Sequence, residues 1–310
     1  MFWSSVPPTR RVVRLSTVST FALAAVVTLW TAPLSAQAAG TSLTPIATDV
    51  YLSRGSAGNS VIAVTKAGVA IVGAQTAAGQ PALAREIAAI THSPVRFVML
   101  TAHPGIESDR DAGWSRAGAT TIVEEHSGYR IGRGLRAEYG KNPVPVTAPG
   151  MPSLGFSEVQ QIHLVDEDIH VVRQKPGNTD SDVSAHFEEA KVIYLGNALA
   201  VDGYPVVDAA HGGRLDGLIE TSAKFMGWPG TKFVPGRGDV VTNVEVKAFH
   251  DMLVAVRDLV KAMKDKGQSL DAIIAAHPTA AYDAQWGKVD GSAKALVTAA
   301  YHSLEPAAGK

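Results

Sequence analysis

An imidazole and a carboxylate stand four residues apart in the segment that follows an apolar run at residues 95–100. They belong to His103 and Glu107, and zinc accepts both side-chain types as ligands. Further carboxylates follow at Asp109 and Asp111. One interpretation of this spacing is a mononuclear metal site that could activate water for hydrolysis. The preferred interpretation is a solvated loop whose acidic residues bind nothing.

Other groups that could do chemistry have a structural interpretation. Ser181 and Ser184 lack the sharp strand-to-helix turn that exposes a nucleophilic serine. No lysine and no helix signal follow the glycines of residues 55–58, which predicts a turn and not a phosphate-binding loop. Residues 124–126 (Glu-Glu-His) are interpreted as a charged strand end. Four histidines are expected to be surface or half-buried structural residues: His92, His163, His170 and His186.

The composition limits the class of protein. Of the 310 residues, 46% are hydrophobic and 18% are charged, which is typical of a globular chain and excludes a disordered or fibrous one. Because 28 basic and 29 acidic residues nearly cancel, we expect no nucleic-acid partner. The sequence has no cysteine, which excludes disulfides, thiolate catalysis and zinc sites with sulfur ligands.

The first 38 residues have the pattern of a signal peptide. Three arginines between positions 10 and 14 precede an apolar run at residues 20–30, which is too short for a bilayer core of about 30 Å. Small residues favour cleavage after Ala38, with an uncleaved anchor as the alternative. Cleavage would remove three basic residues and no acid, so the mature chain has 25 basic and 29 acidic residues, a net charge of −4. We therefore expect a periplasmic or secreted protein with no membrane association after cleavage.

Strand and helix signals are spread over both halves of the mature chain. β-Branched and apolar segments predict strands at residues 50–52, 60–65, 69–73, 95–100, 119–123, 158–165, 168–173, 183–187, 191–195 and 231–234. Helices are expected at residues 80–91, 109–117, 214–226, 269–276 and 292–303, and a capping box of Thr242 and Glu245 opens a longer one that ends before Gly267. A long surface loop is expected at residues 142–152. Neither half has enough helix to cover both faces of a sheet, so the predicted fold is α/β, an αββα sandwich.

Several stretches carry a family resemblance: PVRFVMLTAHPG, GNTDSDVSAHFEEAKVIYLGN, GGRLDGLI and KFVPGRG. Through them the chain resembles the metallo-β-lactamase fold superfamily, in its exported, hydrolase-like branch. The resemblance implies the αββα sandwich of that family and covers essentially the whole mature chain. It implies one domain over residues 39–310, with a core at residues 46–238 and a C-terminal helical extension at residues 239–310.

The family would bind two zinc ions, and this sequence departs from the family pattern at the ligand positions. The four positions of the first motif are occupied by Ala102, Pro104, Ile106 and Glu107. The three later ones are occupied by Asn178, Asn197 and Arg237. Three of the seven have no donor atom, the amides of asparagine suit zinc poorly, and arginine is a permanent cation. We therefore expect no bound zinc and no other cofactor.

The former metal motif predicts a pocket and no catalytic residue. The expected pocket residues are Ala102, His103, Pro104, Ile106, Glu107, Asn178, Asp180, Asn197 and Arg237. The preferred interpretation is a non-catalytic protein that binds an unidentified small molecule or protein. The alternative is a hydrolase whose site works without metal or is rebuilt from His103, Glu107 and neighbours such as Asp180, Asp202 and His211. Within the pocket, Arg237 is predicted to pair with Glu107 or Asp180 in place of the bridging metal charge.

Overall fold

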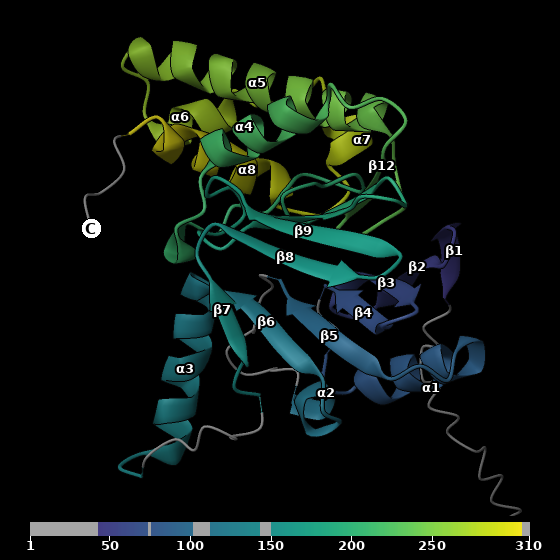
Figure 1. The fold of residues 1–310 in the computed structure, drawn as a ribbon. Helices are drawn as coiled ribbons and strands as arrows, with labels where there is room; N and C mark the ends of the chain where they lie inside the picture. Colours follow the sequence, from purple (N-terminus) through teal and green to yellow (C-terminus); the bar gives the residue numbers. More distant parts are fainter. Residues whose placement is uncertain (1–42, 74–75, 102–111, 143–149, 306–310) are drawn as a thin grey trace, which may run out of the picture. The chain divides into compact units, whose positions relative to one another are not determined.

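A computed structural model of the chain describes residues 43–73, 76–101, 112–142 and 150–305 (Figure 1). These residues form two β-sheets that face each other, with helices on both outer sides. The strand order is β1-β2-β3-β4-β5-β6-β7 in the larger sheet and β12-β11-β10-β9-β8 in the smaller one. The predicted αββα sandwich is therefore confirmed.

The seven-stranded sheet is antiparallel from β1 to β4 and parallel from β4 to β7. Its strands are β1 (Thr44–Ala47), β2 (Val50–Gly55), β3 (Gly58–Thr65), β4 (Gly68–Val72), β5 (Val95–Leu100), β6 (Thr120–Glu124) and β7 (Leu154–Phe156). Its outer face is covered by α1 (Gln80–Ile90), α2 (Ala112–Arg116) and α3 (Glu125–Tyr139). Because β5 and β6 are parallel, their carboxyl ends lie at the same edge of the sheet.

The five-stranded sheet carries the remaining helices. Its strands are β8 (Val159–Leu164), β9 (Glu167–Arg173), β10 (Val183–Phe187), β11 (Val192–Gly196) and β12 (Lys232–Pro235). A short 3-10 turn, η1 (Ala209–His211), precedes the helices α4 (Leu215–Phe225), α5 (Asn243–Asp265), α6 (Leu270–Ala275), α7 (Asp283–Trp286) and α8 (Ser292–Ser303). In the described part of the chain, no helix is both long enough and apolar enough to cross a membrane.

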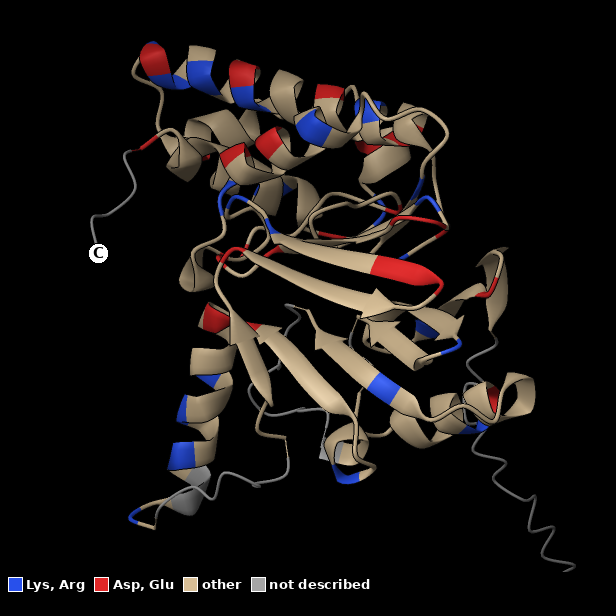
Figure 2. Cartoon of the chain, in the orientation of Figure 1, with Lys and Arg blue, Asp and Glu red and all other residues tan. Residues whose placement is uncertain are grey.

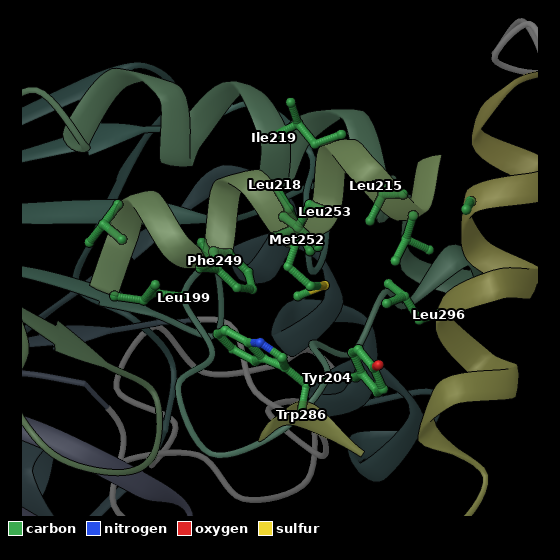
Figure 3. Packing of buried hydrophobic residues seen from close by; sticks show 14 of the residues in the cluster. Leu199, Tyr204, Leu215, Leu218, Ile219, Phe249, Met252, Leu253, Trp286 and Leu296 are labelled. Atoms are coloured by element: carbon green, nitrogen blue, oxygen red, sulfur yellow. The ribbon is translucent and has the colours of Figure 1, made fainter. Parts of the chain in front are cut away.

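Three apolar layers hold the sandwich together. Leu52, Val171 and Phe187 belong to the layer between the two sheets. On the outer face of the larger sheet, Leu83 of α1 packs with strand residues. On the outer face of the smaller sheet, Phe249 on α5 lies in a cluster that joins α4, α5 and α8 (Figure 3). Burial of these side chains at roughly 25 cal/mol per Å² stabilises the fold.

Most of the expected helices and strands are confirmed, and their observed ends lie within about two residues of the predicted ends. Strand β10 and helix α8 coincide with the segments predicted from sequence, and the capping box of Thr242 and Glu245 is present at the start of α5. Helix α2 confirms part of the helix expected at residues 109–117, of which residues 109–111 lie outside the described chain. Of the expected loop at 142–152, residues 143–149 also lie outside it.

Helix α3 was not expected, and the interpretation of residues 124–126 as a strand end was incomplete. Glu124 ends β6 and also caps α3, because its Oε2 accepts from the N–H groups of His126 (2.8 Å) and Ser127 (3.3 Å). Three glycines in the helix lower its intrinsic propensity and hid it from sequence analysis. Ile131 and Leu135, four residues apart, are buried against the larger sheet, and this tertiary packing stabilises the helix.

A buried carboxylate fixes the start of β9 to the hairpin between β10 and β11. Glu167 accepts from the backbone N–H groups of Glu189 (3.1 Å) and Ala190 (3.2 Å), and its carboxyl group is also hydrogen-bonded to the side chain of Glu189. Burial, together with the neighbouring Glu189 carboxylate, raises the pKa of Glu167 from 4.5 to about 7. Folding therefore favours the protonated form of this group.

This pKa shift predicts a specific pH dependence of stability. Between pH 4.5 and 7 the folded chain holds a proton on Glu167 that the unfolded chain has released, so this group's contribution to stability falls as the pH rises. Glu167→Gln removes this titration, so the difference in free energy of unfolding between the variant and the wild type should shift by about 2–3 kcal/mol in favour of the variant from pH 5 to pH 8. Urea denaturation at both pH values measures the shift, and a difference between the two proteins that is independent of pH would contradict it.

Candidate functional site

The structure describes four of the nine expected pocket residues. Asn178 and Asp180 lie between β9 and β10, Asn197 follows β11, and Arg237 follows β12. Outside the described residues lie Ala102, His103, Pro104, Ile106 and Glu107, together with Asp109 and Asp111. The alternative of a metal site rebuilt from His103 and Glu107 is therefore not tested by the described residues.

Asp182 organises the loop between β9 and β10. Its buried carboxylate accepts from the backbone N–H groups of Gly177 (3.2 Å), Asn178 (2.6 Å) and Thr179 (3.0 Å), and from the Thr179 hydroxyl (3.1 Å). Burial raises the pKa of Asp182 from 3.8 to about 6, although these donors oppose the shift. The carboxylate is thus a structural acceptor that holds the loop in one conformation.

Two glycines let the start of α4 pack directly on this loop. A Cβ on Gly213 would lie 2.2 Å from the Asn178 carbonyl oxygen, and one on Gly217 would lie 1.9 Å from the Pro176 carbonyl oxygen. No other residue fits at these separations. The close approach also lets the Asp180 N–H donate to the His211 carbonyl at 2.8 Å. Residues 176–182 and 208–217 therefore form one compact rim.

A buried ion pair links this rim to α3. Arg130 Nη1 donates to Asp180 Oδ1 at 2.8 Å, and Arg130 Nη2 donates to Ser181 Oγ at 2.8 Å. The Ser127 hydroxyl donates to the same Ser181 oxygen at 2.8 Å. The guanidinium of Arg130 thus balances the charge of the Asp180 carboxylate, although 50 residues separate the two in the sequence.

The prediction that Arg237 would pair with Asp180 is wrong. Arg237 is exposed, and its Nη2 donates to the Ser56 carbonyl at 2.9 Å. The β12 loop that carries Arg237 is held by Asn59, whose Nδ2 donates to the Pro235 and Gly238 carbonyls at 2.9 Å each. This anchoring directs Arg237 to the Ser56 turn, whereas Arg130 already occupies Asp180. The other predicted partner, Glu107, lies outside the described residues.

The described residues at the positions that the resemblance assigns to zinc ligands do not fit a zinc pair. Asn178 Nδ2 donates to the Val206 carbonyl at 2.9 Å, so this amide is used in loop structure. Asn197 supplies a neutral amide where the family pattern has a carboxylate, and Arg237 supplies a cation. Zinc requires imidazole, carboxylate or thiolate donors, and a fixed positive charge near it would be repelled. The chemistry of these donors is incompatible with the metal centre that the resemblance implies.

Within the described residues, one group has the ligand types and spacing for a metal: Glu124, Glu125 and His126, with one ligand atom of each within 4.8 Å of the others. Glu124 is already fully engaged, since it caps α3, contacts His126 Nδ1 at 2.7 Å and lies 3.5 Å from Arg173 Nε. A metal would displace these contacts and meet the positive charge of Arg173. The group is therefore a helix cap with an ion pair.

A cleft of about 1600 Å³ opens beside the Arg130–Asp180 pair. Three parts of the chain form its walls: the first turns of α3, residues 207–214, and α8. Charged residues that line it are Glu125, Arg130, Arg133, Arg173, Asp180, Arg214 and Lys294, with His126, His211 and His302. Tyr129, Val207 and the alanines at positions 209, 210, 295 and 299 supply apolar surface. Sequence analysis missed this cleft because it did not predict α3.

A hydrogen-bonded serine and histidine also occur on β10, and neither lines the cleft. Ser184 Oγ lies 2.8 Å from His186 Nε2 on β10 and accepts from Gln174 Nε2 at 2.8 Å. Both residues are buried, and burial, with help from the charge of Lys224, lowers the pKa of His186 to about 4. The His186 ring packs edge-on against Phe225 and Trp228. The pair lies in the core and cannot reach a substrate.

Comparison with known proteins gives a match in structure alone. No protein-family model and no curated protein matches the sequence. A solved metallo-β-lactamase from Pontibacter korlensis has a TM-score of 0.56 at 15% identity and covers 69% of this chain and 99% of its own. The stereoselective inverting sec-alkylsulfatase Pisa1 from Pseudomonas sp. has a TM-score of 0.60 at 14% identity over 85% of this chain, and a double mutant of it gives 0.60 at 13% over 84%. This chain spans 50% of the length of the sulfatase. At these identities the likeness concerns the fold.

Proposed function

Because this chain has the metallo-β-lactamase fold, we propose that it is an exported, non-catalytic protein of that fold which binds a ligand in the cleft beside the former metal site. The observation that carries the proposal is the donor chemistry of the former ligand positions. Asn178 is committed to the Val206 carbonyl and Arg237 to the Ser56 carbonyl. Hydrolysis on this fold would need metal-bound water, for which these side chains are unsuited.

The polar rim supports binding over catalysis. Asp180 is the carboxylate among the four described pocket residues, and Arg130 holds it in an ion pair at 2.8 Å. The guanidinium thus occupies one oxygen of this carboxylate and limits its access to a substrate. The signal-peptide pattern of residues 1–38 supports export to the periplasm or beyond, and the mature protein's partner would be a small molecule or another protein.

Metal analysis tests this proposal directly. Protein produced with zinc, iron and manganese in the medium and purified without chelator should contain far less than one equivalent of any of them. Its thermal midpoint should not change on addition of EDTA, because apolar burial in three layers and not metal ligation stabilises the fold.

One or two equivalents of metal, lost to EDTA together with several degrees of thermal stability, would overturn the proposal. Metal-dependent hydrolysis of lactam, thioester or sulfate-ester substrates would do the same. Elemental analysis, differential scanning calorimetry and substrate assays on the same preparation make these outcomes distinguishable.

A further inference from the structure

The cleft beside the Arg130–Asp180 pair has a charge opposite to that of the mature chain. Among the described residues that line it, five are lysine or arginine and two are acidic, so its net formal charge is +3 with neutral histidines. Residues 39–310 as a whole carry 25 basic and 29 acidic residues. Blue positions, which mark Lys and Arg, lie along the ribbon of α3 in Figure 2. A concave, locally positive surface on an acidic protein concentrates anions.

The positive groups are arranged on two helical faces. On α3, His126, Arg130 and Arg133 are spaced three or four residues apart and line the cleft together. On α8, Lys294 and His302 are eight residues apart, again on one face. A ligand in the cleft would therefore meet positive charge from more than one wall.

Two of these cations are available to a ligand. Arg130, Arg173 and Arg214 have partners in the fold, with Arg173 near Glu124 and Arg214 donating to the Glu305 carbonyl at 2.9 Å. The side chains of Arg133 and Lys294 are exposed and form no hydrogen bond or ion pair with any described residue. They can bind an external anion without giving up a contact that holds the fold.

The cleft also has an apolar surface beside these charges. The Tyr129 side chain is 63% exposed and lies on the same face of α3 as Arg133. Val207 and four alanines extend this surface across the cleft. An exposed aromatic ring beside cations suits a ligand with both an apolar body and a negative group.

We propose that the cleft binds an organic anion, with Arg133 and Lys294 contacting its sulfonate, carboxylate or phosphate group and Tyr129 contacting its apolar body. This inference rests on the proposed function of a ligand-binding protein and names the chemical class of the ligand. The volume of about 1600 Å³ exceeds the roughly 300–1000 Å³ of sites for drug-sized molecules, so the cleft accommodates a ligand larger than a single ring.

Isothermal titration with three probes tests the proposal. Naphthalene-2-sulfonate should bind, its affinity should fall as salt is raised, and the cation of the same shape, 2-naphthyltrimethylammonium, should bind at least tenfold more weakly. Inorganic sulfate, which lacks the apolar body, should also bind at least tenfold more weakly. Equal binding of the two naphthalene probes, or no sulfonate binding at millimolar concentration, would overturn the proposal.

Variants locate the binding. Arg133→Gln and Lys294→Gln should each weaken sulfonate binding about threefold and the double variant about tenfold, in line with exposed ion pairs of up to about 1 kcal/mol. The matched control is Arg85→Gln, which removes an exposed arginine of α1 outside the cleft and should leave binding unchanged. Unaltered binding by the double variant would show that the anion binds elsewhere. Metal content decides the non-catalytic assignment independently, so the two proposals can fail separately.

Discussion

Replacement of Arg130 by methionine is expected to lower the free energy of unfolding by about 3 kcal/mol. The Arg130 and Asp180 side chains are only 15% and 12% exposed, and their charged atoms are 2.8 Å apart. Methionine keeps much of the apolar length of arginine but leaves the Asp180 carboxylate without this cation in a poorly hydrated site. Urea denaturation at pH 7 measures the loss.

A second replacement separates the ion pair from simple packing. Asp180→Asn in the Arg130→Met background should recover about 1–2 kcal/mol, because the carboxylate that has lost the Arg130 guanidinium is removed. Arg136→Met changes an exposed arginine of the same helix and should cost less than about 0.5 kcal/mol. If Arg130→Met is as mild as Arg136→Met, Arg130 does not stabilise the Asp180 carboxylate and the ion pair is not a structural link between α3 and the rim.

Asp182→Asn is expected to cost about 2–4 kcal/mol. Four donors, three of them backbone N–H groups of residues 177–179, converge on the two oxygens of this buried carboxylate. Asparagine has one acceptor oxygen, and its amide N–H₂ would face N–H donors, so buried donors would lose their acceptor. Denaturation at pH 7.5, above the pKa of about 6, compares the variant with ionised Asp182.

The matched control for this variant is Asp239→Asn, which changes a carboxylate that is 88% exposed and pairs with Arg54 on the surface. It should change stability by less than about 0.5 kcal/mol. A variant as stable as the wild type would mean that the loop keeps its conformation without these four hydrogen bonds.

The two-sheet architecture could be predicted because local sequence and tertiary packing agree there. Strand β10 has five buried residues and β-branched or aromatic ends, and α5 has a capping box followed by an apolar stripe. The same agreement fails at α3, where glycines lower the helix propensity and burial of Ile131 and Leu135 compensates for it. Such compensation depends on a sheet surface that is assembled from distant residues.

The sequence alone determined which chemical groups this protein lacks. The positions that the resemblance assigns to zinc ligands hold Asn178, Asn197 and Arg237, and no conformation of the chain can change the donor type of a side chain.

Only the tertiary structure decided which cation meets Asp180 and where a ligand could bind. Arg130 and Asp180 are 50 residues apart, and the packing of α3 against the rim brings them together, while the Asn59 contacts direct Arg237 to Ser56. The cleft likewise needs α3, residues 207–214 and α8 in place at once. The Arg130–Asp180 ion pair and the concave shape of the cleft both arise from contacts between segments that are distant in the sequence. These contacts form only when the chain is folded.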